Sequence, residues 1–172
     1  LFSSLFLLIL FVPLLVIYLI TLISIKGSPI YSQVRLGKNK KEFRMYKFHS
    51  YKIGAPEIPP YKVKEHELDP YRYKWGDFLR KSSIDELPQL INILIGNMSF
   101  VGPRPGAKEN EEELILEREK FSPSPFLVKP GLTGLAQIKL KRNHDPKEKG
   151  KYDSLYVNKI GFILDLKIIC AT

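Results

Sequence analysis

Two adjacent acids in the middle of the chain are the residue types best suited to chemistry. Asp85 and Glu86 lie in the stretch "SSIDELPQLINILIGN" (residues 82–97), directly before an apolar pattern. An ionised aspartate can attack phosphorus as a nucleophile, and an adjacent glutamate can bind a divalent metal that neutralises phosphate charge. Acids at helix starts also have a simpler role, because they accept hydrogen bonds from free backbone N–H groups. The pair alone leaves catalysis and helix capping both open.

An amphipathic helix is predicted to follow the acid pair. Ser83-x-x-Glu86 formally matches a capping box, but this cap would place Pro88 beyond the first turn, where it breaks the hydrogen-bond ladder. With Asp85 as the N-cap and Glu86 at the first helical position, Pro88 falls within the first turn. We therefore expect Asp85 to cap the helix, where the helix dipole favours its ionised form. The packing face is predicted to consist of Leu87, Leu90, Ile91 and Leu94, with Gly96-Asn97 as the stop signal.

Two basic residues lie in turns that prolines make rigid. Arg104 stands between two prolines in "VGPRPG", and each proline fixes its own φ and restricts the residue before it. A guanidinium held in this way suits bidentate phosphate binding, while a structural salt bridge is the simpler alternative. Lys129 begins "KPGLTG", which predicts a tight turn with a basic residue beside it. The chain contains no P-loop, dinucleotide fingerprint or nucleophile elbow, so acids and phosphate-binding cations remain as candidates.

The composition fits one domain with an anionic partner. The chain has 172 residues and a net charge of +9, from 27 Lys+Arg and 18 Asp+Glu. The first 25 residues carry no charge, while residues 26–81 hold 14 basic and 6 acidic residues. This asymmetry suggests a lipid surface, a phosphorylated substrate or nucleic acid, but the apolar N-terminus and an acidic middle argue against nucleic acid. The single cysteine, Cys170, excludes an internal disulfide and disfavours a cysteine-based metal site.

The apolar run over residues 1–25 is long enough to enter a bilayer. Its length and the missing cleavage site argue against a signal peptide. Pro13 lies in its middle and should kink or break a helix, so a kinked spanning helix and a re-entrant helix both remain open, with a buried core helix as a third alternative. The basic stretch that follows indicates the cytoplasmic side. Because the chain opens with Leu and stops after an apolar run, we expect a fragment at both ends.

The segments on either side of the acid pair predict short strands and loops. Residues 29–50 predict a β-hairpin that turns at Gly37 and Asn39. Residues 51–76 carry four prolines and little periodicity, which predicts a loop that shapes the substrate site. "MSFVGPRPG" predicts a short strand followed by a rigid turn.

The last third of the chain predicts helices. Residues 107–121 form an acidic stretch with few apolar residues, which is typical of a solvated surface helix. Residues 128–140 predict a turn followed by a strand or a short helix. The end of the chain predicts a helix with Tyr152, Tyr156 and Ile160 at four-residue spacing. The apolar "FILDLKII" after it suggests an amphipathic helix at a membrane interface.

Together these stretches resemble the bacterial sugar transferases, which are monotopic polyprenyl-phosphate phosphoglycosyl transferases. The resemblance rests on four motifs in family order: "SPIYSQVRLGKNKKEFRMYKFHS", "LRKSSIDELPQLINILIGNMSFVGPRP", "VKPGLTGLAQ" and "FILDLKII". It implies transfer of a sugar-1-phosphate from a UDP-sugar to polyprenyl phosphate, with release of UMP. The runner-up interpretation from the residues is a non-catalytic membrane-anchored module that binds anionic lipid or a partner.

The resemblance also implies roles for individual residues. Asp85 matches the nucleophile that attacks the β-phosphate and forms a covalent phosphosugar intermediate, and Glu86 matches the ligand of Mg2+. A phosphate-binding arginine after "AQ" maps to Arg142 if one residue is inserted, or otherwise to Lys141; Arg142 is preferred because Asn143 then also matches. The other expected substrate or phosphate contacts are Lys47, Arg104 and Lys129.

The family pattern favours a re-entrant membrane helix that keeps both ends cytoplasmic. The fold class expected is therefore helix-rich α+β: a re-entrant helix over residues 1–25, broken at Pro13, then a small cytoplasmic catalytic domain over residues 26–172 with a β-hairpin and interfacial amphipathic helices. The implied location is the cytoplasmic face of the bacterial inner membrane. The chain departs from the pattern at Val12, where a serine is usual, and at His49, Asn97 and Gly106, which replace an arginine and two acids.

Overall fold

The computed structural model describes residues 2–58, 61–64, 66–108, 111–140 and 145–172, with side chains from residue 11 onward. These residues form two units. The first comprises Leu1–Gln33, Arg44–Glu57 and Val63–Ile95, and the second comprises Val34–Phe43, Ile58–Lys62 and Gly96–Thr172. Helices predominate in the described chain and each of its sheets has two strands, so the predicted helix-rich α+β class is confirmed.

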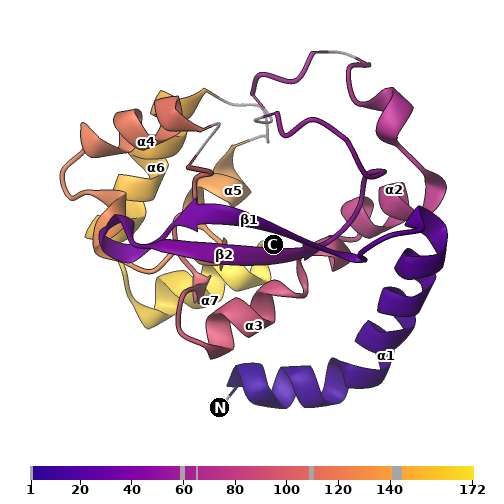
Figure 1. Cartoon of the computed structure of the whole chain (residues 1–172). Coiled ribbons are helices and arrows are strands. Elements are labelled where there is room, and N and C mark those ends of the chain that lie inside the picture. Colours follow the sequence, from indigo (N-terminus) through magenta and orange to yellow (C-terminus); the bar gives the residue numbers. More distant parts are fainter. Residues whose placement is uncertain (1, 59–60, 65, 109–110, 141–144) are drawn as a thin grey trace. The chain divides into compact units, whose positions relative to one another are not determined.

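Helix α1 (Phe2–Ile25) begins the first unit and contains Pro13 within its span. Figure 1 shows that this helix bends along its course, as expected where a proline removes a backbone donor and crowds the preceding turn. The expected break at Pro13 is thus a bend within one continuous helix. Within the described ranges, no helix has both the length and the apolar character that a membrane crossing requires.

A buried threonine joins α1 to α2 (Lys74–Lys81). Thr21 Oγ1 donates to the carbonyl oxygen of Ile17 at 2.7 Å and accepts from Trp75 Nε1 at 2.9 Å. Thr21 is fully buried, so these bonds satisfy polar groups that water does not reach. The interruption of the apolar run at this position therefore has a packing role.

The predicted β-hairpin is confirmed as β1 (Ile30–Leu36) and β2 (Glu42–Phe48) (Figure 1). Its turn contains η1 (Lys38–Lys40), and Asn39 there has φ 55°. This left-handed conformation is one that asparagine tolerates better than most residues. Gly37 instead has φ −103°, and Lys40 is the second left-handed residue of the turn, with φ 57°.

The proline-rich segment after the hairpin is mainly a loop, as expected. It contains the short η2 (Asp69–Tyr71) before α2 begins at Lys74. The backbone N–H of Lys52 donates to the carbonyl oxygen of Tyr71 at 2.8 Å, which closes the loop at its base.

Two short parallel strands lie at the centre of the second unit. Strand β3 (Ser99–Val101) pairs with β4 (Gly131–Thr133), with Ser99 opposite Gly131 and Val101 opposite Thr133. The chain beyond β3 passes so close to β4 that a Cβ on Gly102 would lie 2.5 Å from the carbonyl oxygen of Lys129. A side chain at this position would displace the backbone, so the sheet requires glycine there. The segment of residues 128–140 contains both predicted alternatives, a strand and then helix α5 (Leu135–Lys139).

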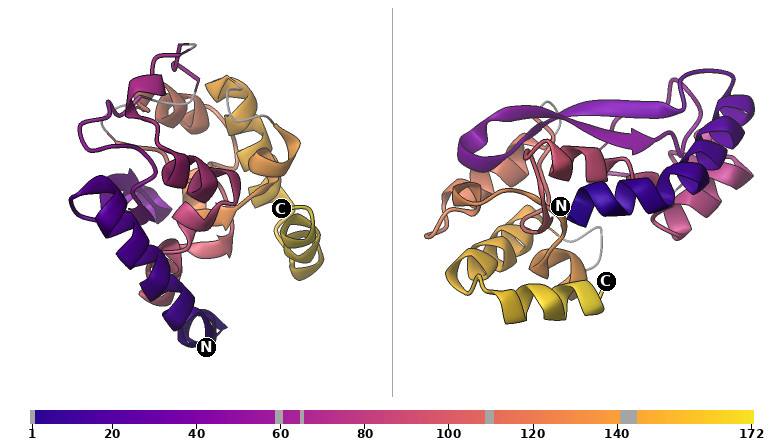
Figure 2. Two further views of the ribbon diagram at one scale, coloured as in Figure 1. Left: turned by 90° about the vertical axis from the view of Figure 1, so that its right-hand side faces the viewer. Right: turned by 90° about the horizontal axis from the view of Figure 1, so that it is seen from below.

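A core cluster packs these strands against helices α6 (Pro146–Asn158) and α7 (Phe162–Cys170). Figure 2 shows the two helices joined at an angle by a short turn. Tyr156 is nearly fully buried, and its hydroxyl bonds to Asp165 Oδ1 at 2.9 Å and to the carbonyl oxygen of Val101 at 3.3 Å. The buried members of the cluster are Val101, Leu135, Tyr156 and Ile168.

The predicted C-terminal helix ends earlier than expected. Helix α6 stops at Asn158, so Ile160 lies outside it, and Gly161 precedes α7. Helix α7 buries Ile168 but leaves a row of large apolar side chains in solvent. The exposed residues of this row are Phe162, Ile163, Leu166 and Ile169.

The expected acidic helix is present as α4 (Glu112–Glu119) with Glu112, Glu113 and Glu119 exposed, but it is not solvated on all sides. This helix lies beside α6 (Figure 1) and buries Leu114 and Arg118. Arg118 donates from Nε and Nη2 to Asp153 Oδ2 at 2.9 and 2.5 Å, across 35 residues of sequence. Burial raises the pKa of Asp153, and Arg118 opposes that rise. A buried guanidinium and a buried carboxylate thus compensate each other.

Replacing Arg118 should cost stability because it leaves the Asp153 carboxylate buried without its cation. Arg118→Met is expected to lower the free energy of unfolding by about 3–5 kcal/mol, measured by urea denaturation. Lys120→Met is the matched control, since Lys120 pairs with Glu117 at 2.5 Å with 65% of its side chain exposed, and it should cost less than about 1 kcal/mol. Equal losses in the two variants would contradict the account.

Candidate functional site

The two acids of the first unit lie in a tight turn that precedes a short helix. Ser83 has φ 57° and is followed by the 3-10 turn η3 (Ile84–Glu86), and the α-helix α3 spans Gln89–Leu94. Asp85 is therefore not the N-cap of this helix, and Ser83 makes no capping bond with its side chain either. The predicted cap position was wrong.

Pro88 explains the difference. The backbone N–H groups of Glu86 and Leu87 donate to the carbonyl oxygens of Ser83 and Ile84, each at 3.1 Å, in the spacing of a 3-10 helix. Pro88 has no N–H, and its φ of −59° and ψ of −17° are helical, so the α-helical ladder starts only after it. The chain turns tightly before the proline, and this places both acids one turn upstream of α3.

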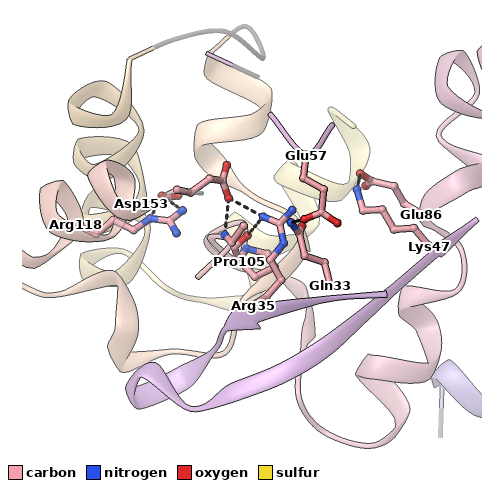
Figure 3. Close-up of polar contacts among 10 residues, drawn as sticks. Gln33, Arg35, Lys47, Glu57, Glu86, Pro105, Arg118 and Asp153 are labelled. Carbon is pink, nitrogen blue, oxygen red and sulfur yellow. Dashed lines mark hydrogen bonds and ion pairs between the residues drawn. The ribbon is translucent and has the colours of Figure 1, made fainter. Parts of the chain in front are cut away.

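Glu86 is held by a cation from the hairpin. Lys47, on β2, donates from Nζ to Glu86 Oε1 at 2.9 Å, with side chains 15% and 12% exposed respectively. Figure 3 shows the two side chains directed at each other. A pair that is largely shielded from water interacts more strongly than one at the surface. Of the predicted site residues, the structure therefore brings Lys47 and Glu86 into contact.

Asn92 holds α3 against the strand that carries Lys47. Its Nδ2 donates to the carbonyl oxygen of Arg44 at 2.7 Å, and its Oδ1 accepts from the N–H of Tyr46 at 3.1 Å. The side chain is fully buried and bonds to β2 as a neighbouring strand would. The predicted packing face of α3 is corrected accordingly: Leu90 is buried, as expected, together with Gln89 and Asn92, whereas Ile91 and Leu94 are exposed.

Asp85 is buried, with 6% of its surface exposed. A carboxylate shielded from water is less stabilised by hydration, which favours reaction with an electrophile. Glu86 already accepts a cation in Lys47, and a Mg2+ site in proteins needs only one or two carboxylates when substrate phosphates and waters complete it. Within the described ranges, no group of three or more His, Cys, Asp or Glu gathers at one point. Asp85 and Glu86 are therefore the two carboxylates in this turn, fewer than a site built by the chain alone would need.

Gln89 is a buried polar residue that sequence reasoning missed. It is 2% exposed, and its Nε2 has no hydrogen-bond partner in the described part of the chain. It follows Asp85 by about one helical turn. A buried amide donor without a partner costs free energy, so this amide should lower the stability of the fold. The sequence gives little indication of this burial, because Gln89 is polar and lies at a position outside the predicted apolar face.

In the second unit, Arg104 lines a small, open hollow at the surface. The walls come from the proline-flanked turn itself, from the end of β1, and from η4 (Pro125–Leu127). Arg118 also lines this pocket. Burial lowers the pKa of Lys149, and the Arg118 and Arg104 guanidiniums lower it further, against the opposing effects of Glu111 and Asp153. Arg104 therefore lies among charges of both signs, the cations Lys149 and Arg118 and the acids Glu111 and Asp153.

The other predicted contacts are placed differently. Lys129 does not line the Arg104 pocket; its Nζ lies 3.5 Å from where a Cβ of Gly96 would be. His49 Nδ1 lies 2.7 Å from the carbonyl oxygen of Ser28, so the imidazole is engaged at the base of the hairpin. Arg142 and Lys141, the alternative phosphate contacts, lie outside the described residues.

Comparison with known proteins covers the whole chain. A sequence profile of the family described as "Bacterial sugar transferase" matches residues 1–172. The galactosyl transferase CpsE of Streptococcus agalactiae serotype III (strain NEM316) is 38% identical over 168 residues, which cover 91% of this chain and 36% of the relative. The uncharacterized sugar transferase EpsL of Bacillus subtilis (strain 168) is 39% identical over 160 residues, covering 92% of this chain and 75% of the relative.

A third relative has a more specific name. The UDP-glucose:undecaprenyl-phosphate glucose-1-phosphate transferase of Klebsiella pneumoniae is 38% identical over 175 residues, covering 99% of this chain and 37% of that protein. The chain thus spans little more than a third of the length of two of these relatives.

The buried amide of Gln89 gives a stability test of the site. Gln89→Met keeps the volume similar and removes the donor without a partner, so it is expected to raise the free energy of unfolding by about 1 kcal/mol. Asn92→Leu is the matched comparison on the same helix, because the bonded Asn92 amide should destabilise the protein when lost. Urea denaturation measures both. A loss of stability in Gln89→Met as large as that in Asn92→Leu would contradict the placement.

Proposed function

The chain belongs to the bacterial sugar transferase family, and from this we propose that it transfers a sugar-1-phosphate from a UDP-sugar to polyprenyl phosphate, releasing UMP. The product would initiate assembly of a polysaccharide or glycoconjugate. The observation that carries the proposal is the family match over residues 1–172 together with the Asp85-Glu86 pair within it. A relative from Klebsiella pneumoniae named for this type of reaction supports it.

The proposed reaction has two displacements at one phosphorus atom. A carboxylate oxygen of Asp85 attacks the β-phosphorus of the UDP-sugar, and the bond from that phosphorus to the bridging oxygen breaks. The electron pair leaves with UMP, and the sugar phosphate stays bonded to Asp85. An oxygen of polyprenyl phosphate then attacks the same phosphorus and breaks the bond to Asp85. The carboxylate is regenerated and the product is a polyprenyl diphosphate sugar.

The chain's own residues supply binding and positioning. The buried setting of Asp85 excludes water that would hydrolyse the intermediate. Arg104 would bind diphosphate oxygens, since its guanidinium matches them in geometry. Arg142 and Lys129 stay as proposed phosphate contacts. Lys47 orients Glu86 through their ion pair.

Mg2+ is the proposed metal, and Glu86 is the residue that would hold it. When bound, the ion would neutralise negative charge on the diphosphate. Lys47 contacts Oε1 of the Glu86 carboxylate at 2.9 Å, so Mg2+ would share this carboxylate with the lysine. The chain would then provide one ligand and the substrate and waters the rest.

The proposed location is the cytoplasmic face of the bacterial inner membrane, with α1 re-entering the bilayer and both its ends on the same side. The bend of α1 (Figure 1) supports such a path, since a return to the same face requires a change of direction. Exposed apolar side chains on α7, among them Phe162 and Ile163, support contact of the second unit with lipid.

The nucleophile assignment is tested by UMP release. Asp85→Asn should abolish release of UMP from UDP-glucose and UDP-galactose with polyprenyl phosphate and Mg2+, because an amide cannot displace UMP. Asp77→Asn is the matched control: Asp77, on α2, pairs with Arg72 at 3.0 Å, and its variant should keep full turnover. Full turnover in Asp85→Asn would overturn the assignment. Liposome binding by the wild type without UMP release from any UDP-sugar would favour a non-catalytic membrane module.

The re-entrant path is tested by labelling in intact membranes. In a Cys170→Ser background, cysteines introduced at Ser4 and at Lys38 should react with an impermeant maleimide from the same, cytoplasmic side. The background without added cysteine is the control and should not label. Labelling of the two positions from opposite sides would show a spanning helix.

A further inference from the structure

The turn that carries Arg104 is fixed by hydrogen bonds on both sides of the arginine. The carbonyl oxygen of Pro103 accepts from the N–H of Gly131 at 3.0 Å, and that of Gly106 accepts from the N–H of Leu36 at 3.1 Å. These backbone bonds belong to the pairing of neighbouring segments. Two charged side chains, Arg35 and Glu111, also bond to the turn.

Arg35 reaches the turn from the end of β1. Its Nη1 donates to the carbonyl oxygen of Pro105 at 2.9 Å and to Glu111 Oε2 at 2.6 Å, across 76 residues of sequence in the latter case. Figure 3 shows the guanidinium directed at Pro105. Both partners of the ion pair are largely buried, with side chains 14% and 11% exposed. Charged hydrogen bonds in such surroundings are strong and directional.

Glu111 closes the turn from its other end. Its Oε2 accepts from the N–H of Ala107 at 2.6 Å, while its own N–H donates to the carbonyl oxygen of Ala107 at 3.0 Å. Gly106 has no side chain that could anchor the turn. One carboxylate therefore binds the backbone just after the proline-flanked arginine and also the guanidinium that holds Pro105.

The two prolines alone do not fix the position of the turn that carries Arg104. Each proline sets its own φ and limits the preceding residue, but neither determines where the turn lies relative to the rest of the unit. The Arg35–Glu111 pair connects the turn to β1, and the end of β1 forms one wall of the Arg104 pocket through Leu36 and Gly37. A shift of about 1 Å in a binding group is enough to weaken its function strongly.

We propose that Arg35 and Glu111 are positioning residues that hold the Arg104 guanidinium in the geometry that binds the diphosphate of the nucleotide sugar. This inference rests on the proposed function for the identity of the ligand. Neither residue is assigned a contact with substrate, and both act through the turn. The pair is thus distinct from Arg118–Asp153, which joins α4 to α6.

The test is a double-mutant cycle on the binding of UDP, measured by calorimetry with Mg2+. Glu111→Gln and Arg35→Lys should each weaken UDP binding about tenfold, a coupling in the usual range for contacting residues. Arg104→Ala should weaken it at least as much. In the Arg104→Ala background, Glu111→Gln should add nothing, because the residue acts only through Arg104. Glu42→Gln is the matched control on the same hairpin, since Glu42 pairs with Lys108 at 2.6 Å with both side chains 52% exposed.

The measurements separate the positioning role from a loss of folding and from a failure of the proposed reaction. The positioning role would be overturned if Glu111→Gln weakened UDP binding equally in the wild-type and Arg104→Ala backgrounds. It would also be overturned if Arg104→Ala did not weaken UDP binding. Thermal unfolding of every variant identifies a loss of folding; if Glu111→Gln unfolds, Arg35→Lys, which keeps the charge, carries the cycle. UMP release by the wild type is measured separately. Its absence would reject the proposed reaction, whereas the binding cycle still decides the role of the pair.

Discussion

A charge that is removed from water must be compensated, and this constraint organises both units. A buried charge without a partner costs several kcal/mol, yet the chain buries charged side chains at several points. Lys47 compensates Glu86, Arg35 compensates Glu111, and Arg118 compensates Asp153. Each pair joins segments far apart in sequence, so each fixes a geometry that local propensity cannot set. The Lys47–Glu86 pair holds Glu86, the proposed metal ligand. The Arg35–Glu111 pair holds the turn that carries Arg104, the proposed phosphate contact.

The residues that we propose for catalysis and binding are held differently in each unit. In the first unit, a 3-10 turn before Pro88 places Asp85 and Glu86, and the Asn92 amide holds the following helix against β2. In the second unit, a turn between two prolines presents Arg104, and side chains from β1 and from the start of α4 hold that turn. In both units, proline restricts the backbone and side-chain hydrogen bonds hold the segment that carries the functional residue. Such preorganisation reduces the entropy lost when a flexible diphosphate binds.

The sequence predicted well the features that depend on neighbouring residues. The hairpin, the proline-rich loop and the short strand before "GPRPG" follow from turn residues and alternation, and the structure confirms them. The cap at Asp85 was wrong because Ser83 adopts a left-handed conformation and the chain tightens into a 3-10 turn before Pro88. The acidic helix was taken as solvated because Asp153, the partner of Arg118, lies 35 residues away. Arg35 and Glu111 were not recognised for the same reason, since no local pattern connects them.

The central claim is that Asp85 forms the covalent intermediate, and mass spectrometry of the intact protein tests it most directly. The protein is incubated with Mg2+ and UDP-glucose or UDP-galactose but without polyprenyl phosphate, so that the second displacement cannot occur. The account predicts an added mass of one sugar phosphate, located on Asp85 by peptide mapping and lost when polyprenyl phosphate is supplied. An adduct on another residue, or UMP release without any adduct, would contradict it.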